Sequence, residues 1–235
     1  MSTAVILAAG EFPRKPYPLY LLQSADILVC CDGAFAGFLR RMPKLFGGWG
    51  RLPDAVVGDM DSLPKALQER YPSLMHPVSE QDDNDQTKAV RYVLDHHPEV
   101  SEIHILGATG RRADHTIGNL SLLMEYPRLF AAGSSPATDP RHSTDKPWNL
   151  PTIDIVSDYG TAFAITDSCE LHVGQGRRVS LFSPDNTLVI RSEGLRWPTD
   201  GVIFDNWWKA TLNRATADVI RLTLSHPSRA LVILD

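Results

Sequence analysis

Short, continuous runs of apolar residues mark the first half of the chain, and a Gly or an Asp follows each of them. Runs without alternation are typical of strands that a parallel sheet buries on both faces. They lie at 4–9, 27–31, 55–57 and 103–106. Helical spacing of apolar residues predicts helices at 87–97 and 116–124. Strands that alternate with helices predict an N-terminal open, mostly parallel α/β sheet.

The second half has a different pattern, in which short apolar stretches are separated by turn residues. We expect strands at 162–165, 170–173, 178–182, 187–190, 219–224 and 230–234. Such a series predicts a small C-terminal antiparallel β-sandwich. The intervening segment 133–151 is rich in Pro, Ser and Asp and predicts a loop or linker. We therefore expect two domains, at 1–150 and 151–235.

Composition narrows the class of protein further. The chain has 235 residues, a net charge of −5 and no Lys/Arg run, which argues against nucleic acid as its main partner. Its three cysteines, Cys30, Cys31 and Cys169, contain no CxxC pair and fit neither a disulfide framework nor a zinc site. The first apolar run is too short for a membrane span, and no basic leader precedes it. We expect a cytoplasmic protein with no membrane partner.

Two carboxylates, Asp59 and Asp61, follow the third apolar run within Gly58-Asp59-Met60-Asp61-Ser62. In an open α/β sheet the ligand lies beyond the carboxyl ends of the strands. If the backbone here is extended, both carboxylates project to the same side, and hard oxygen ligands select Mg²⁺ or Ca²⁺. The alternative is an acidic turn in which Asp59 or Ser62 caps the next helix. This motif alone leaves both interpretations open.

A second acidic cluster, Gln81-Asp82-Asp83-Asn84-Asp85, precedes the helix predicted at 87–97. A helix N-terminus favours one or two carboxylates through its dipole, but that effect does not require three. The cluster could complete the shell of a metal ion, or bind a ribose or an amine.

A glycine-rich loop follows the run at 103–106 and leads into the helix predicted at 116–124. It contains Gly107, Thr109, Gly110, Arg111, Arg112, Asp114 and His115, and Asn119 follows it. Glycines and a helix N-terminus present N–H groups to an anion, and arginines offer forked donors to phosphate. The alternative is an ordinary βα turn, with Asp114 as the helix cap and two solvated arginines.

A fourth region contains Gly194-Leu195-Arg196-Trp197, then Trp207, Trp208 and Asn213. Aromatic faces can stack on a flat cationic ring. The interpretation favoured by this region alone is that the three tryptophans pack the small β core.

Together these motifs resemble the thiamine pyrophosphokinase family. The resemblance implies an enzyme that moves a diphosphate group from ATP to the hydroxyl of thiamine, giving thiamine diphosphate and AMP with Mg²⁺. It also implies an α/β nucleotide domain followed by a β-sandwich for thiamine binding and dimerisation, and hence a homodimer.

The resemblance also assigns roles to individual residues. Metal ligands would be Asp59, Asp61 and Asp85. ATP would contact Gly10, Asp32, Gly33, Gly107, Thr109, Gly110, Arg112, Asp114, His115 and Asn119. Thiamine would contact Gln81, Trp197 and Asn213. Catalysis would use the metal-binding acids and Arg112, with Asp85 or Asp82 taking the hydroxyl proton.

One departure from the family pattern bears on the acceptor. The stretch Ala210-Thr211-Leu212-Asn213 carries a leucine where the family has a small hydroxyl-rich stretch. A diphosphokinase for a related heterocyclic alcohol, such as a hydroxymethylpterin, therefore stays open. So does a nucleotide-binding protein without turnover, although the acidic motifs argue against it.

Overall fold

The computed structural model describes residues 2–48, 50–130 and 150–235. They form two compact units, Met1–Asn119 with Pro151–Asp158, and Leu120–Leu150 with Tyr159–Asp235. The units do not divide the chain at the expected boundary of 150/151, because 152–157 form a strand of the first unit. The loop predicted at 133–151 lies outside the described residues, apart from 150 and 151.

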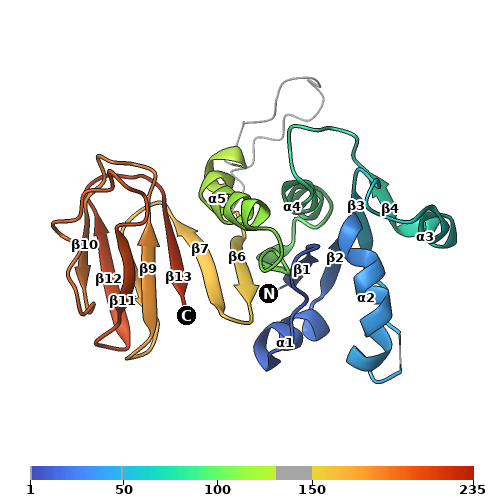
Figure 1. Ribbon diagram of the computed structural model, residues 1–235, viewed down its shortest axis with the longest axis horizontal. Coiled ribbons are helices and arrows are strands. Elements are labelled where there is room, and N and C mark those ends of the chain that lie inside the picture. The colour runs from blue at the N-terminus through green and yellow to red at the C-terminus, as the bar shows by residue number, and fades with distance from the viewer. Residues whose placement is uncertain (1, 49, 131–149) are drawn as a thin grey trace. The chain divides into compact units, whose positions relative to one another are not determined.

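The first unit is built on a parallel sheet with the strand order β6-β5-β1-β2-β3-β4 (Figure 1). Its strands are β1 (Ser2–Leu7), β2 (Ile27–Cys31), β3 (Ala55–Gly58), β4 (Met75–Pro77), β5 (Val100–Leu106) and β6 (Thr152–Ser157). Each neighbouring pair runs parallel. The predicted parallel α/β sheet is thus confirmed. The pattern missed β4, which has three residues, and β6, which Asp154 interrupts.

Helices cover both faces of this sheet. The helices of the described residues are α1 (Pro16–Ser24), α2 (Asp32–Leu45), α3 (Lys65–Arg70), α4 (Asp85–His96) and α5 (Ala113–Leu129), with the 3-10 turn η1 (Pro72–Leu74). Helix α5 extends from the first unit into the second. Phe35 and Phe38 of α2 pack in one cluster with Leu28 and other strand residues. The buried α4 residues, Val90 among them, lie outside that cluster, and α4 contacts β1, β2, β3 and β5. Burial on two faces explains why the strands are continuously apolar.

The helices expected at 87–97 and 116–124 are confirmed by α4 and α5. In contrast, the suggestion that Asp59 or Ser62 caps the next helix is wrong. That helix, α3, has Pro64 at its N-cap position, and no side chain forms a capping hydrogen bond there. The two acidic-turn carboxylates are therefore available for another role.

The second unit consists of two antiparallel sheets, β11-β9-β13-β7 and β10-β12-β8. The strands are β7 (Gly160–Ile165), β8 (Cys169–His172), β9 (Arg178–Phe182), β10 (Ile190–Glu193), β11 (Ala210–Arg214), β12 (Val219–Leu224) and β13 (Ala230–Leu234). Leu181 of β9, Val232 of β13 and Leu222 of β12 share one buried core. The predicted antiparallel β-rich half is confirmed. None of the helices in the described residues is long and apolar enough to cross a membrane.

The strand predicted at 187–190 is misplaced, since β10 begins only at Ile190. The cause is the side chain of Asp185, which accepts hydrogen bonds from the backbone N–H and the hydroxyl of Thr187, at 2.9 and 2.6 Å. A carboxylate that bonds the chain two residues ahead folds it into a turn. The apolar residues after Thr187 therefore start in a turn, and the strand follows them.

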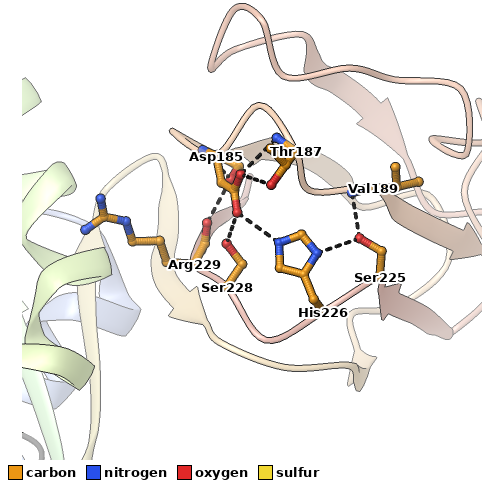
Figure 2. A network of polar contacts seen from close by, with 8 residues as sticks. Asp185, Thr187, Val189, Ser225, His226, Ser228 and Arg229 are labelled. Atoms are coloured by element: carbon orange, nitrogen blue, oxygen red, sulfur yellow. Dashed lines mark hydrogen bonds and ion pairs between the residues drawn. The ribbon is translucent and has the colours of Figure 1, made fainter.

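Asp185 is also the centre of a polar network, which Figure 2 shows. It accepts a hydrogen bond from Ser228 at 2.7 Å and lies 3.1 Å from Nε2 of His226. Nδ1 of His226 is 3.0 Å from the hydroxyl of Ser225, which accepts the N–H of Val189. Hydrogen bonds from Thr187 and then from Ser228 hold the pKa of Asp185 well below its usual range. This Ser-His-Asp arrangement joins two loops of the second unit.

Candidate functional site

The turns that follow β1 and β5 are joined through their backbones. Gly10 donates its N–H to the carbonyl of Gly107 at 2.6 Å, and Glu11 donates to the carbonyl of Thr109 at 2.7 Å. A Cβ on Gly10 would lie 2.3 Å from the Gly107 oxygen, so only glycine fits there. Gly107 has φ +67°, and a Cβ on it would lie 2.6 Å from the Ala8 oxygen. Backbone hydrogen bonds thus join two of the predicted glycine turns to each other.

Asp32 connects the ends of β2 and β3. Its side chain is buried and accepts the N–H of Gly33 at 2.5 Å and that of Ser62 at 3.4 Å. A Cβ on Gly58 would lie 2.7 Å from its Cγ. Burial raises the pKa of Asp32, and the N–H groups of Gly33 and Ser62 partly oppose the shift. The carboxylate predicted to contact ATP thus holds together the turns around it.

Asp59 and Asp61 do not lie on an extended backbone. Met60 between them has φ +68°, a left-handed conformation that is uncommon for a residue other than glycine. The carboxylate of Asp59 accepts the N–H of Asp61 at 3.0 Å. This bond, and to a lesser extent one from the side chain of Gln81, lowers the pKa of Asp59. Local turn geometry, and not strand alternation, sets the positions of these acids.

Asp85 is the first residue of α4, directly after the N-cap residue Asn84, whose side chain accepts the N–H of Thr87 at 2.9 Å. Partial burial, and then the nearby Asp32 carboxylate, raise the pKa of Asp85 to about 6. Asp59 acts in the same direction. Nζ of Lys88, whose side chain is 3% exposed, lies 4.0 Å from Asp85 and partly offsets the shift. Three carboxylates thus repel one another beside one buried ammonium.

The donor set fits a divalent cation only in part. Within the described ranges, no three His, Cys, Asp or Glu side chains are close enough together to hold one metal ion. The predicted trio of Asp59, Asp61 and Asp85 is therefore not assembled as a complete cage. Magnesium usually takes one or two protein carboxylates, with waters and substrate phosphate oxygens completing its shell. The mutual repulsion of Asp59 and Asp85 is consistent with such an open site.

Two residues predicted to contact ATP contact each other. The guanidinium of Arg112 donates to the carboxylate of Asp114 through two nitrogens, with Nε at 3.1 Å. This bond lowers the pKa of Asp114 to about 2, and both side chains are exposed. His115 follows at the start of α5 and is exposed as well. A phosphate that used Arg112 would have to share it with Asp114.

Asn119 has a structural role that its sequence position did not reveal. Its side chain donates to the carbonyl of Ala108 at 2.7 Å and accepts from the side chain of Asn84 at 2.9 Å. Its carbonyl accepts from Gln86 at 3.2 Å. Asn119 thus joins the glycine loop to the start of α4. Asn84 was not predicted as the N-cap of α4, although Asn three residues before Thr87 is a typical helix-cap signal.

The residues predicted to contact thiamine are divided between the units. Gln81 belongs to the first unit, and Trp197 and Asn213 belong to the second. The Asn213 side chain is buried, accepting the N–H of Trp197 at 3.1 Å and donating to its carbonyl at 2.6 Å. The expectation that the three tryptophans pack the core is wrong, since Trp197, Trp207 and Trp208 are 53%, 43% and 53% exposed.

Trp197 and Asn213 line a hollow together with Leu212. Leu212 is 83% exposed and has φ +61°, at an irregularity in the pairing of β11 with β9. An exposed aromatic ring beside a fixed amide is suited to a flat ligand.

Comparisons with known proteins indicate the family and the fold of the chain. Residues 19–131 match a family model described as "Thiamin pyrophosphokinase, catalytic domain". Residues 160–232 match one described as "Thiamin pyrophosphokinase, substrate-binding domain". The two models thus cover most of the chain, one in each half.

Individual relatives are more distant. Thiamine pyrophosphokinase 1 of Oryza sativa subsp. japonica is 29% identical over 141 residues, 54% of this chain and 53% of the relative. Thiamine pyrophosphokinase 1 of Arabidopsis thaliana is 30% identical over 139 residues, 53% of this chain and 51% of the relative. The chain therefore spans about half the length of the curated relatives it matches.

Solved structures resemble the whole chain. The crystal structure of thiamine pyrophosphokinase from Bacillus subtilis matches with a TM-score of 0.71 at 17% identity, over 100% of this chain and 99% of that one. Thiamin pyrophosphokinase from Candida albicans matches with a TM-score of 0.72 at 15% identity, over 99% and 88%. At these identities the likeness concerns the fold.

Proposed function

Because the chain belongs to the thiamine pyrophosphokinase family, we propose that it transfers the diphosphate of ATP to the hydroxyl of thiamine, giving thiamine diphosphate and AMP. The observation that carries the proposal is the group of Asp32, Asp59 and Asp85, with buried Lys88 beside Asp85, at the carboxyl ends of the parallel strands. Ligands of open α/β sheets bind at this edge. The proposal includes a homodimer in the cytoplasm, which rests on the family likeness alone.

The proposed chemistry is an in-line displacement at phosphorus. The acceptor oxygen forms a bond to the β-phosphorus of ATP, the bond from that phosphorus to the bridging α–β oxygen breaks, and AMP leaves. Asp85 or Asp82 takes the hydroxyl proton on a carboxylate oxygen. Asp85 is favoured because it lies with Asp32 and Asp59 and beside buried Lys88.

Mg²⁺ would be held by one or two of the carboxylates of Asp59, Asp61 and Asp85, with water and oxygens of the nucleotide completing its shell. When bound, it supplies charge neutralisation for the phosphate oxygens. ATP would be oriented by the hydrogen-bonded turns that contain Gly10 and Gly107. The ion pair of Arg112 and Asp114 would contribute as well. In the second unit, Trp197 and Asn213 would hold the acceptor ring.

The direct test measures AMP released from Mg-ATP with thiamine as acceptor, by chromatography. We expect AMP and thiamine diphosphate in equal amounts, and no AMP without acceptor. The exposed Leu212 in the acceptor hollow favours a parallel arm with a hydroxymethylpterin. If AMP forms with the pterin and not with thiamine, the pterin is the acceptor. AMP with neither compound would contradict both transferase proposals.

Magnesium binding should depend on pH through Asp85. Its pKa is raised from 3.8 to about 6 in the folded, metal-free chain. Deprotonation of Asp85 therefore lowers the free energy of unfolding of that chain as the pH rises to about 6. A cation binds only the deprotonated carboxylate. Its positive charge offsets the repulsion between Asp85 and the neighbouring carboxylates. We therefore expect Mg²⁺ to raise the thermal midpoint more at about pH 7.5 than at about pH 5. Calorimetric melts would measure both midpoints, and Asp85→Asn should show much less dependence. An equal Mg²⁺ effect at both pH values would contradict this role.

A further inference from the structure

Three arginines of the second unit form a lateral row across neighbouring chain segments. In the pairing of β11 with β9, Arg214 lies opposite Arg178. On the other side of Arg214, Arg196 donates its backbone N–H to the Arg214 carbonyl at 2.9 Å. Strand register therefore holds the three residues next to one another, although they are distant in the sequence.

The row carries more positive charge than its surroundings neutralise. Like charges placed directly opposite each other destabilise a sheet. Arg178 forms an ion pair with Asp235 at 2.9 Å. Among the residues that the structure describes, no ion pair joins Arg196 or Arg214 to a carboxylate. Two guanidinium charges thus have no carboxylate partner within residues 2–48, 50–130 and 150–235, in a chain whose net charge is −5.

The row lines a hollow of about 390 Å³ that also includes Ser180 and Trp197. That size is within the range of small-ligand sites. The Ser180 hydroxyl accepts the N–H of Leu212 at 3.0 Å, so its own proton points elsewhere and is available to a ligand. The Arg196 guanidinium lies over the Trp197 ring, 5.0 Å from its centroid. Forked donors, a hydroxyl and an aromatic ring therefore occur together.

We propose that this hollow binds the phosphate or diphosphate group of a ring compound, with Arg178, Arg196 and Arg214 as its donors. Arginine forks match phosphate oxygens, and a phosphate would neutralise the charge that the row leaves uncompensated. Trp197, Leu212 and Asn213 line both this hollow and the acceptor hollow, so the ring of the ligand would lie where the proposed function places thiamine. Free thiamine has no phosphate for the row to bind, whereas thiamine diphosphate is an anion at its diphosphate end. The choice of ligands rests on the proposed function, which supplies thiamine diphosphate and AMP as the two sources of that chemistry.

The test is calorimetric titration of the full chain without divalent metal, using inorganic pyrophosphate, thiamine diphosphate, AMP and thiamine. We expect pyrophosphate and one of the two ring phosphates to bind, with affinity that falls as salt rises, and thiamine to bind more weakly. Arg196→Gln and Arg214→Gln should each weaken binding about ten-fold. Arg191→Gln, on β10 of the same unit and outside the hollow, is the matched control and should bind like the wild type.

One variant has the opposite expected sign. Asp235→Asn removes the carboxylate that competes for Arg178, so pyrophosphate should bind several-fold more tightly. Undiminished binding in the Arg196→Gln/Arg214→Gln double variant, or no binding by the wild type, would overturn the proposal. Comparison of thiamine diphosphate with AMP identifies the ring. The titration involves no turnover, so arginine-dependent binding would support the anion site even if no thiamine-dependent AMP is released. If AMP is released but the arginine variants bind pyrophosphate like the wild type, only the anion site is rejected.

Discussion

Asp85→Asn should lower kcat/KM for thiamine-dependent AMP release by about 10³-fold, the size expected when a general acid–base group is removed. The structure provides the reason. Partial burial, and then the Asp32 carboxylate, raise the pKa of Asp85 to about 6 in the metal-free chain. Asparagine keeps the shape of the side chain but can neither take a proton nor neutralise a cation. Steady-state rates at saturating Mg-ATP would measure the effect.

Asp82→Asn is the matched control, because it removes one carboxylate from the same acidic segment. Asp82 is exposed, its N–H is bonded to Glu80, and it lies outside the group of Asp32, Asp59 and Asp85. We expect its activity to stay within about ten-fold of the wild type. The opposite order of the two variants would make Asp82 the proton acceptor.

Asp85→Asn should also stabilise the metal-free chain while it removes activity. It relieves the repulsion with Asp32 and Asp59, but the Asp85 side chain is 40% exposed, so solvent screens much of that repulsion. We therefore expect a gain of only about 1 kcal/mol in the free energy of unfolding at neutral pH. Urea unfolding in chelator would measure it. A destabilised variant would mean that Asp85 has a structural role instead.

Gly10→Ala should destabilise the chain by about 3 kcal/mol and abolish nucleotide binding. The added Cβ would lie 2.3 Å from the Gly107 carbonyl oxygen and 2.4 Å from that of Thr109. Both obstacles are backbone atoms, so no flexible side chain can move aside. The turns after β1 and β5 would have to separate, breaking the hydrogen bond from Gly10 to Gly107. Urea unfolding and ATP titration would measure the two effects.

Gly118→Ala is the matched control for this substitution. Gly118 lies within α5, and a Cβ there would meet no atom within 4 Å. Alanine in a helix interior restricts the unfolded chain and should stabilise the protein by about 0.5–1 kcal/mol. If both substitutions had the same small effect, the junction of the two turns would not be the rigid element described here.

Acidic and glycine residues at strand ends could be recognised from the sequence because their signal is local. Continuous apolar runs reflect burial on two faces, and Gly or Asp after each run marks the binding edge of a parallel sheet. Helical spacing of apolar residues, which is also local, predicted the helix that the structure begins at Asp85. Short strands separated by turn residues predicted the antiparallel character of the second half. That pattern failed at 187–190, where the Asp185 side chain turns the chain before the strand begins.

The sequence by itself thus determined the continuously apolar strands, the helices at 87–97 and 116–124 and the acids that follow these strands, since all depend on residues only a few positions apart. Only the tertiary structure decided how these acids behave. Asp32 raises the pKa of Asp85 across more than fifty positions, and Asn119 joins Ala108 to Asn84. The arginine row likewise exists only because strand register places Arg214 opposite Arg178. Register and burial depend on how distant segments pack, and that information is absent from any local pattern.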